Sequence, residues 1–303
     1  MLSLSTAWKS ADIATGFELL KSIYDSGFSA IELDYRITES MYQEIRPSLK
    51  RKDLLVTSIH NYFPFADDLN KTEASADRYL LSSLDREERE LGIKLTRKTI
   101  QIANDLEAKA VILHLGKVEM MDEENVIVEF FEHKESTTEE AQQFIKLKES
   151  ERNSKNLKHL DAVLFSLEKL NKESERQDIL LGLENRYHYY EIPSIAEFKT
   201  IFKNFEGSNL RYWHDTGHAQ VNEHLGIQNH EDYLKAFADK LIGLHLHDVV
   251  DLEDHLAPGT GAVNFEMIGN YLEENVIKVI EVHSNVTIEE LFKSHAFLIT
   301  KGF

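Results

Sequence analysis

The sequence predicts an α/β fold, a single (β/α)₈ barrel domain over residues 1–303. Eight short apolar or β-branched runs recur along the chain, and segments with helical periodicity separate them. Strand followed by helix, repeated eight times, requires a parallel sheet with helices outside, and eight such units close a barrel. The length alone would suit two domains, but barrels of this kind often reach about 250 residues as one unit. An open doubly wound sheet is the alternative, although the first predicted strand lacks the G-x-G-x-x-G turn of many such sheets.

The predicted strands are the most apolar short runs of the chain. They cover residues 2–7, 30–33, 54–59, 110–115, 179–183, 210–213, 241–246 and 279–282. Between them, leucines at 157, 160, 164, 167 and 170 form a stripe with helical spacing. A predicted last helix, 287–297, begins with the capping-box pattern Thr287-x-x-Glu290.

Two connections are long, namely 61–109 after the third strand and 116–178 after the fourth. Within the second, residues 119–156 are highly charged and poor in glycine and proline. This composition predicts a helical excursion after strand four, over the C-terminal face of the barrel. A lid over the barrel mouth and a solvated helical insertion are both compatible with it.

Composition excludes several classes of site and partner. The chain has no cysteine, which excludes disulfides, thiolate zinc sites and cysteine nucleophiles. The net charge of −19 disfavours a nucleic-acid partner. The N-terminal segment MLSLSTAWKS does not resemble a signal peptide, and no apolar run is long enough for a membrane span. We therefore expect a cytoplasmic protein without a membrane partner.

Six consecutive predicted strands, the third to the eighth, end in side chains that bind metals. These side chains are His60, His114, Glu184, Asp215 with His218, His245 with His247, and Glu281. The carboxyl ends of barrel strands converge on one mouth. Imidazole and carboxylate ligands suit Zn²⁺, Mn²⁺, Fe²⁺ or Co²⁺. A single strand-end histidine is usually a packed or surface residue, but six such ends together predict a shared divalent-metal site.

A further segment follows the seventh strand. Its Pro258-Gly259-x-Gly261 sequence predicts a sharp loop that would hold His255 over the mouth. A plain turn with His255 in solvent is the alternative.

Taken in order, these motifs resemble the xylose-isomerase-like TIM barrels from about Ser3 to Glu281. That superfamily includes sugar isomerases, ketose 3-epimerases, inositol-pathway enzymes and apurinic-site endonucleases. The resemblance is carried by Leu183-Glu184-Asn185, Asp215-x-x-His218, His245-x-x-Asp248, His255-x-x-Pro258-Gly259-x-Gly261 and Glu281.

The resemblance implies a set of metal ligands, with one to three ions of Zn²⁺ or Mn²⁺. The ligands of the metal in the epimerases match Glu184, Asp215, His245 and Glu281. In the endonucleases, residues matching His60 and His114 hold a second metal, and residues matching His218 and His255 hold a third.

Two positions of this ligand set need comment. The remaining third-metal ligand is normally an aspartate, and Glu253 stands there with a longer side chain. His247 would share a strand face with His245, but His245 fits the His-x-x-Asp pattern better.

The preferred function is a metal-dependent isomerase or epimerase of a sugar, sugar phosphate or polyol. Glu184 and Glu281 would remove and return the proton next to a carbonyl. His218 would hold a substrate hydroxyl, and Arg186 would receive a phosphate or sugar oxygen unless it is a surface arginine.

The runner-up is a phosphodiesterase like the apurinic-site endonucleases. His60, His114 and His255 favour it, because a one-metal epimerase does not need them. The acidic charge and the lack of a basic, aromatic patch count against it. A barrel that binds without turnover is the third possibility, and the paired carboxylates argue against it. The sequence leaves the carbohydrate substrate and the oligomeric state open.

Overall fold

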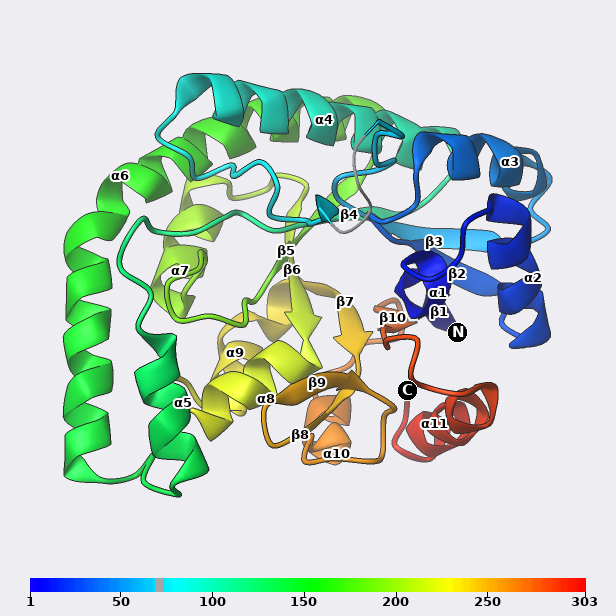
Figure 1. Ribbon diagram of the computed structural model, residues 1–303. Helices are drawn as coiled ribbons and strands as arrows, with labels where there is room; N and C mark the ends of the chain where they lie inside the picture. Colours follow the sequence, from blue (N-terminus) through cyan, green and yellow to red (C-terminus); the bar gives the residue numbers. More distant parts are fainter. Residues whose placement is uncertain (69–72) are drawn as a thin grey trace.

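The computed structural model describes residues 1–68 and 73–303 and contains the predicted barrel (Figure 1). Its sheet is closed in the order β1-β10-β7-β6-β5-β4-β3-β2, and neighbouring barrel strands run parallel. The barrel strands are β1 (Leu2–Ser5), β2 (Ala30–Leu33), β3 (Leu55–His60), β4 (Ala110–Leu113), β5 (Leu180–Glu184), β6 (Leu210–Asp215), β7 (Leu241–Leu246) and β10 (Ile277–Ile280). The predicted strands therefore correspond to the observed ones, with ends that differ by a few residues.

The inside of the barrel is filled by a small apolar cluster that includes Trp213, Ile112 and Val279. Trp213 needs room there, and glycine on both neighbouring strands supplies it. A Cβ at Gly243 would lie 2.1 Å from the indole ring, and one at Gly182 would lie 2.9 Å from it. The Trp213 ring in turn contacts His245, with the ring centroids 5.1 Å apart. Trp213 is therefore part of the floor under the C-terminal mouth.

Helices surround the sheet on the outside, as the strand–helix alternation predicts (Figure 1). They are α1 (Ala7–Ser10), α2 (Gly16–Asp25), α3 (Glu39–Lys50), α4 (Arg86–Asp105), α5 (Glu124–Glu132), α6 (Glu139–Gln177), α7 (Ile195–Asn204), α8 (Thr216–His224), α9 (His230–Phe237), the 3₁₀ turn η2 (Ala238–Lys240), α10 (Phe265–Gly269) and α11 (Ile288–Thr300). The capping box at Thr287 and Glu290 is confirmed at the start of α11. None of the described helices has the length and apolar character that a bilayer span requires.

The connection after β4 is helical, as predicted. It contains α5 and the 39-residue α6, which extends along one side of the molecule beyond α7 (Figure 1). The leucine stripe lies in the second half of α6, where Leu160, Leu167 and Leu170 are buried. The first half is attached to α7 through Arg152, whose Nη2 lies 2.7 Å from Glu197 Oε2, with both side chains buried. Breaking such a buried pair is strongly destabilising, so this end of α6 is firmly placed.

The connection after β7 contains a hairpin that the sequence did not predict. Its strands are β8 (Asp248–Val250) and β9 (Glu253–Leu256), paired antiparallel. Asp248 shapes the following turn, because its carboxylate accepts hydrogen bonds from the backbone N–H groups of Val249, Gly259, Thr260 and Val263. The hairpin is too short to have a clear alternating pattern in the sequence.

Candidate active site

Four predicted ligands meet at the C-terminal mouth of the barrel. Glu184, Asp215, His245 and Glu281 are all buried, and one candidate ligand atom of each lies within 4.8 Å of the others. The Nδ1 atom of His245 lies 2.9 Å from Glu184 Oε1, 3.1 Å from Glu281 Oε2 and 3.7 Å from Asp215 Oδ2. Three carboxylates are thus directed at one ring nitrogen.

Local structure fixes the Asp215 carboxylate in this cluster. Asp215 pairs with His245 in the register of β6 and β7, and its side chain caps α8 by accepting the backbone N–H of His218 at 2.7 Å. Its second oxygen lies 2.9 Å from His247 Nε2. Asn185 accepts the backbone N–H of Asp215 and donates to its carbonyl oxygen. The Asp-x-x-His motif therefore combines a strand end with a helix cap.

Burial and charge act against each other on the ionisable groups of this cluster. Burial alone would raise the pKa of Glu184, but His245 and His114 hold that pKa well below its usual range. Burial would lower the pKa of His245, but Glu281, Glu32 and Glu184 raise it well above its usual range. Glu184 is therefore ionised, and the neighbouring imidazoles offset part of its buried negative charge.

This donor set fits a divalent metal ion. Four buried carboxylates, those of Glu32, Glu184, Asp215 and Glu281, surround the single imidazole of His245. Buried charges of one sign are costly without a counter-ion. In addition, Glu184 Oε2 is buried without a well-aligned hydrogen bond, although His114 Nε2 lies 2.9 Å away.

His60 and His114 lie next to the same glutamate, on its other oxygen. Their Nε2 atoms are 3.5 Å and 2.9 Å from Glu184 Oε2. Their Nδ1 atoms are engaged elsewhere, His60 with the carbonyl oxygen of Asn61 and His114 with Asp77. Glu184 therefore stands between two groups of potential ligands, one on each carboxylate oxygen.

The structure brings Asp254, in place of Glu253, to the third group of predicted ligands. Glu253 is exposed and belongs to none of the potential metal-binding groups among the described residues. Asp254 Oδ1 lies 2.9 Å from His255 Nδ1, and these two residues form a potential metal group with His247. Regular strand alternation would put Glu253 and His255 on one face. His255 has a positive φ of 55°, which breaks this alternation and lets its side chain meet that of the adjacent Asp254.

His255 lies over the mouth, as the loop motif predicts. It adopts a positive φ of 55°, an uncommon conformation for a residue with a side chain. Its ring stacks between those of His247 and His283, with centroid distances of 4.2 Å on both sides. Its Nε2 is 3.8 Å from Glu281 Oε2. The hairpin therefore places this imidazole next to the principal carboxylate cluster.

The two predicted substrate-binding residues also lie at the mouth. His218 Nδ1 is 3.0 Å from the carbonyl oxygen of Asn185, and burial lowers the pKa of this histidine. Arg186 is buried and ion-paired with Glu191 at 2.6 Å and Asp77 at 2.9 Å. Its Nη1 lies 3.9 Å from Glu184 Oε2 and has no hydrogen-bond partner. Arg186 is thus an internal member of the site, and the surface alternative is wrong.

The sequence did not single out Glu32, Asp77 or Asp254 as site residues. Glu32 lies inside an apolar strand, on a fully buried face. Asp77 lies in a long connection without periodicity. A signal was available for Glu32, because a charged residue within a strand of a buried parallel sheet requires a partner.

The loop after β5 is attached to α5 through a histidine that titrates. His188 Nδ1 lies 2.6 Å from Glu124 Oε2. Burial would lower the pKa of His188, but the hydrogen bond to Glu124 and the charge of Glu191 raise it. This pair connects the helical excursion to the mouth.

We expect this pair to stabilise the fold only where His188 is protonated. Its stabilisation is fully present below the ordinary histidine pKa, about 6.5, and is lost as the pH rises through the raised pKa of the folded state. Because the His188 side chain is 40% exposed, the effect should be below ~1 kcal/mol. Thermal unfolding of the wild type and His188→Gln across this pH range measures it. Parallel Tm curves for the two proteins would contradict the expectation.

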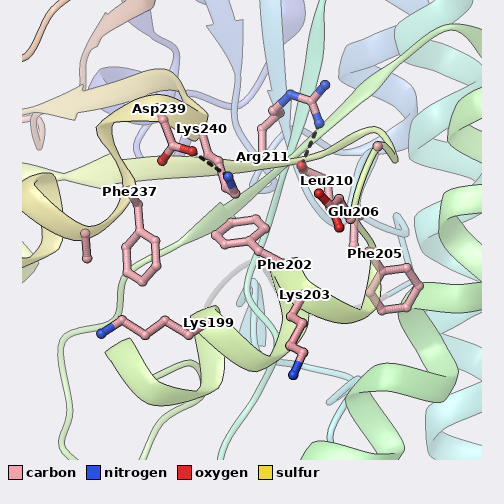
Figure 2. Close-up of a pocket in the computed structure, with 12 residues that line it drawn as sticks. Lys199, Phe202, Lys203, Phe205, Glu206, Leu210, Arg211, Phe237, Asp239 and Lys240 are labelled. Atoms are coloured by element: carbon pink, nitrogen blue, oxygen red, sulfur yellow. Dashed lines mark hydrogen bonds and ion pairs between the residues drawn. The ribbon is translucent and has the colours of Figure 1, made fainter.

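A separate cavity lies at the opposite, N-terminal end of the barrel. It has a volume of about 550 Å³ and is lined by residues of α7, η2 and the start of β6. Figure 2 shows Phe202 and Phe237 at this cavity, with Lys240 paired to Asp239 at 2.6 Å. Arg211 donates to backbone carbonyls of Ser208 and Leu210. Active sites of barrels of this class lie at the other end, so we assign no function to it.

Comparison with known proteins agrees with this architecture. The sequence matches the model of the xylose isomerase-like TIM barrel family over residues 20–296. No curated protein sequence matches the chain.

Similar solved structures include several sugar epimerases. A D-tagatose 3-epimerase-like protein has a TM-score of 0.69 and 19% identity, covering 99% of this chain and 96% of its own. A 3-keto-D-glucoside 4-epimerase from E. coli has a TM-score of 0.67 and 16% identity, covering 99% and 98%. A D-psicose 3-epimerase from Clostridium cellulolyticum H10 has a TM-score of 0.68 and 14% identity, covering 99% of both chains. The similarity to these structures concerns the fold, and the family match establishes that this chain belongs to the xylose isomerase-like TIM barrel family.

Proposed function

We propose that this protein is a divalent-metal-dependent epimerase or isomerase of an uncharged sugar. The observation that carries the proposal is the convergence of Glu184, Asp215 and Glu281 on His245 Nδ1 at the barrel mouth. These four residues would hold one ion of Mn²⁺ or Zn²⁺. When bound, the ion would supply Lewis-acid stabilisation of the negative charge that develops on a substrate carbonyl oxygen.

Glu184 and Glu281 would transfer the proton next to that carbonyl. Both carboxylates lie within about 3.1 Å of the same ring nitrogen, and both have pKa values below the usual range although burial would raise them. One carboxylate removes the proton from one face of the carbon, and the other returns a proton on the opposite face. Such an exchange inverts the carbon. It moves the carbonyl instead when the proton returns to the former carbonyl carbon and the proton of the adjacent hydroxyl passes to the former carbonyl oxygen.

His218 would bind a hydroxyl group of the substrate. We assign its Nδ1 as the donor to the carbonyl of Asn185, because that carbonyl is an acceptor at 3.0 Å. Since burial lowers the pKa of His218, the ring is neutral near pH 7 and Nε2 is left as an acceptor. A sugar hydroxyl is the matching donor.

The charge of the mouth favours an uncharged substrate over a sugar phosphate. Arg186 is already paired with Glu191 and Asp77, and Arg36 is paired with Asp34 at 3.0 Å. A phosphate would therefore meet guanidinium groups whose charge is compensated, beside several ionised carboxylates. Arg186 would offer its unpartnered Nη1 to a neutral sugar oxygen.

Solvent exchange tests this proposal. Purified protein with Mn²⁺ or Zn²⁺ is incubated in deuterated water with free ketoses and with their phosphate esters. We expect deuterium at the carbon next to the carbonyl, with free sugars favoured at least about tenfold, which corresponds to ~1.4 kcal/mol. Absence of exchange across the panel would contradict an epimerase, and a preference for the esters would contradict the uncharged substrate.

A second candidate, a metal-dependent phosphodiesterase, is favoured by one observation. His60 and His114 both approach Glu184 Oε2, so that these three residues would help to hold a second ion, which would supply Lewis-acid stabilisation of a phosphodiester. Nicking of an abasic-site duplex in the presence of Zn²⁺ tests this function directly. Clean nicking at low enzyme, without solvent exchange, would replace the first candidate with the second. We further propose a cytoplasmic location for either enzyme.

A further inference from the structure

Glu32 is a buried carboxylate in the middle of β2, and the proposed proton transfer does not use it. Its side chain is fully buried, and both of its oxygens face the ring of His245. His245 Nε2 lies 3.0 Å from Glu32 Oε1 and 3.2 Å from Oε2. The other ring nitrogen, Nδ1, faces Glu184, Glu281 and Asp215. One imidazole is thus held between Glu32 on one side and the carboxylate cluster on the other.

The barrel holds Glu32 in this orientation from both neighbouring strands. Ser58 Oγ on β3 donates to Glu32 Oε2 at 2.7 Å. Ser5 Oγ on β1 lies 3.4 Å from Glu32 Oε1. The backbone carbonyl of Glu32 accepts the N–H of Thr6. Because the hydroxyl donors are themselves buried, the carboxylate is fixed as an acceptor toward His245.

An imidazole has two neutral tautomers, and only one of them leaves Nδ1 as a ligand. A carboxylate at Nε2 favours the tautomer with the proton on Nε2, since an ionised carboxylate only accepts hydrogen bonds. In the neutral ring of the metal-bound protein, the lone pair of Nδ1 would then be directed at the point where Glu184, Asp215 and Glu281 converge. Metal-binding histidines commonly have their second nitrogen held in this way.

We propose that Glu32 is a positioning residue that keeps the proton of His245 on Nε2 and so prepares Nδ1 to bind the metal. This inference rests on the proposed metal site, and it gives the second strand a role in that site. Glu32 would act through His245 without touching the substrate.

Metal affinity of the variant Glu32→Gln provides the first test. The substitution keeps the size of the side chain but removes its charge, and its amide can also donate to Nε2. We expect affinity for Zn²⁺ or Co²⁺, measured by competition with a chelator, to fall about 10- to 100-fold. At saturating metal, kcat should change far less than the affinity. A folded Glu32→Gln protein with wild-type metal affinity would overturn the proposal.

Asp34→Asn is the matched control for the loss of a buried charge. Asp34 follows the same strand and is equally buried, but its carboxylate accepts hydrogen bonds from Ser10 and Arg36 and not from His245. We expect the metal affinity of Asp34→Asn to stay within about threefold of the wild-type value. Loss of a carboxylate that holds a metal-binding histidine causes a much larger change. An equal loss of affinity in both variants would overturn the specific role of Glu32.

Nuclear magnetic resonance of the wild type gives a test that does not depend on the folding of any variant. In metal-loaded protein with ¹⁵N-labelled histidine, His245 should show a protonated Nε2 and an unprotonated Nδ1. A proton on Nδ1 would overturn the proposal. If the tautomer and the Glu32-dependent affinity are observed but solvent exchange is absent, the proposed function fails while the role of Glu32 stands.

Discussion

Glu281→Gln and Glu184→Gln are each expected to lower kcat for epimerisation by about 10²- to 10⁴-fold, the usual contribution of a general acid or base. An amide cannot take a proton from the carbon next to a carbonyl, and it is a weaker metal ligand than a carboxylate. Steady-state kinetics with deuterium exchange measure the loss, and circular dichroism with thermal unfolding checks the fold. Because both residues contact His245, metal content is measured on the same samples.

Glu289→Gln serves as the control for these two variants. Glu289 is an exposed residue of α11 and pairs only with Lys293 among the described ion pairs. Its substitution should leave kcat within about twofold, as expected for a surface change away from the site. If Glu281→Gln or Glu184→Gln keeps the wild-type rate with full metal content, the assignment of that residue to proton transfer is wrong.

Removal of the metal is expected to abolish activity and to destabilise the fold. Without an ion, neighbouring histidines offset only part of the negative charge of the buried carboxylates of Glu184, Asp215 and Glu281, and the remaining repulsion destabilises the fold. Free metal at about 100 times its Kd would stabilise the folded state by ~2.7 kcal/mol. For a domain of this size we expect Tm to rise by about 5 °C or more. Calorimetry of chelator-treated protein, before and after addition of Mn²⁺ or Zn²⁺, makes the measurement.

A double variant tests how many ions each chain binds. His60→Ala combined with His114→Ala removes the ligands on Glu184 Oε2 and leaves His245 in place. Elemental analysis of this double variant should find about one ion per chain if the cluster around His245 is an independent site. Equal Tm and activity of metal-free and metal-loaded wild type would contradict metal dependence altogether.

The sequence predicted the barrel and the principal cluster because both depend on short-range patterns. The alternation of apolar runs with helical stripes can be seen within short stretches of sequence. Residues at the carboxyl ends of the strands then lie close together, because the closed sheet brings all these ends to one mouth. Thus His60, Glu184 and Glu281 come together although long stretches of chain separate them.

The parts that the sequence did not predict depend on details of the backbone or on long connections. Asp254 takes the place expected for Glu253 because the unpredicted β8–β9 hairpin decides which neighbour faces inward. Asp77 reaches Arg186 and His114 from the connection after β3, which has no periodic pattern. Glu32 gives no strand-end signal, because it lies inside a short strand that is otherwise apolar.

Closure of the sheet has a consequence for how the chain folds. Strand β1 pairs with β10, and Trp8 donates to the carbonyl of Val286 across 278 residues of sequence. During synthesis, β1 leaves the ribosome long before its second neighbour exists. The half-open sheet must therefore keep its exposed β1 edge from pairing with other chains until the last strand arrives. We expect this interval, more than any local step, to determine how much newly made protein aggregates.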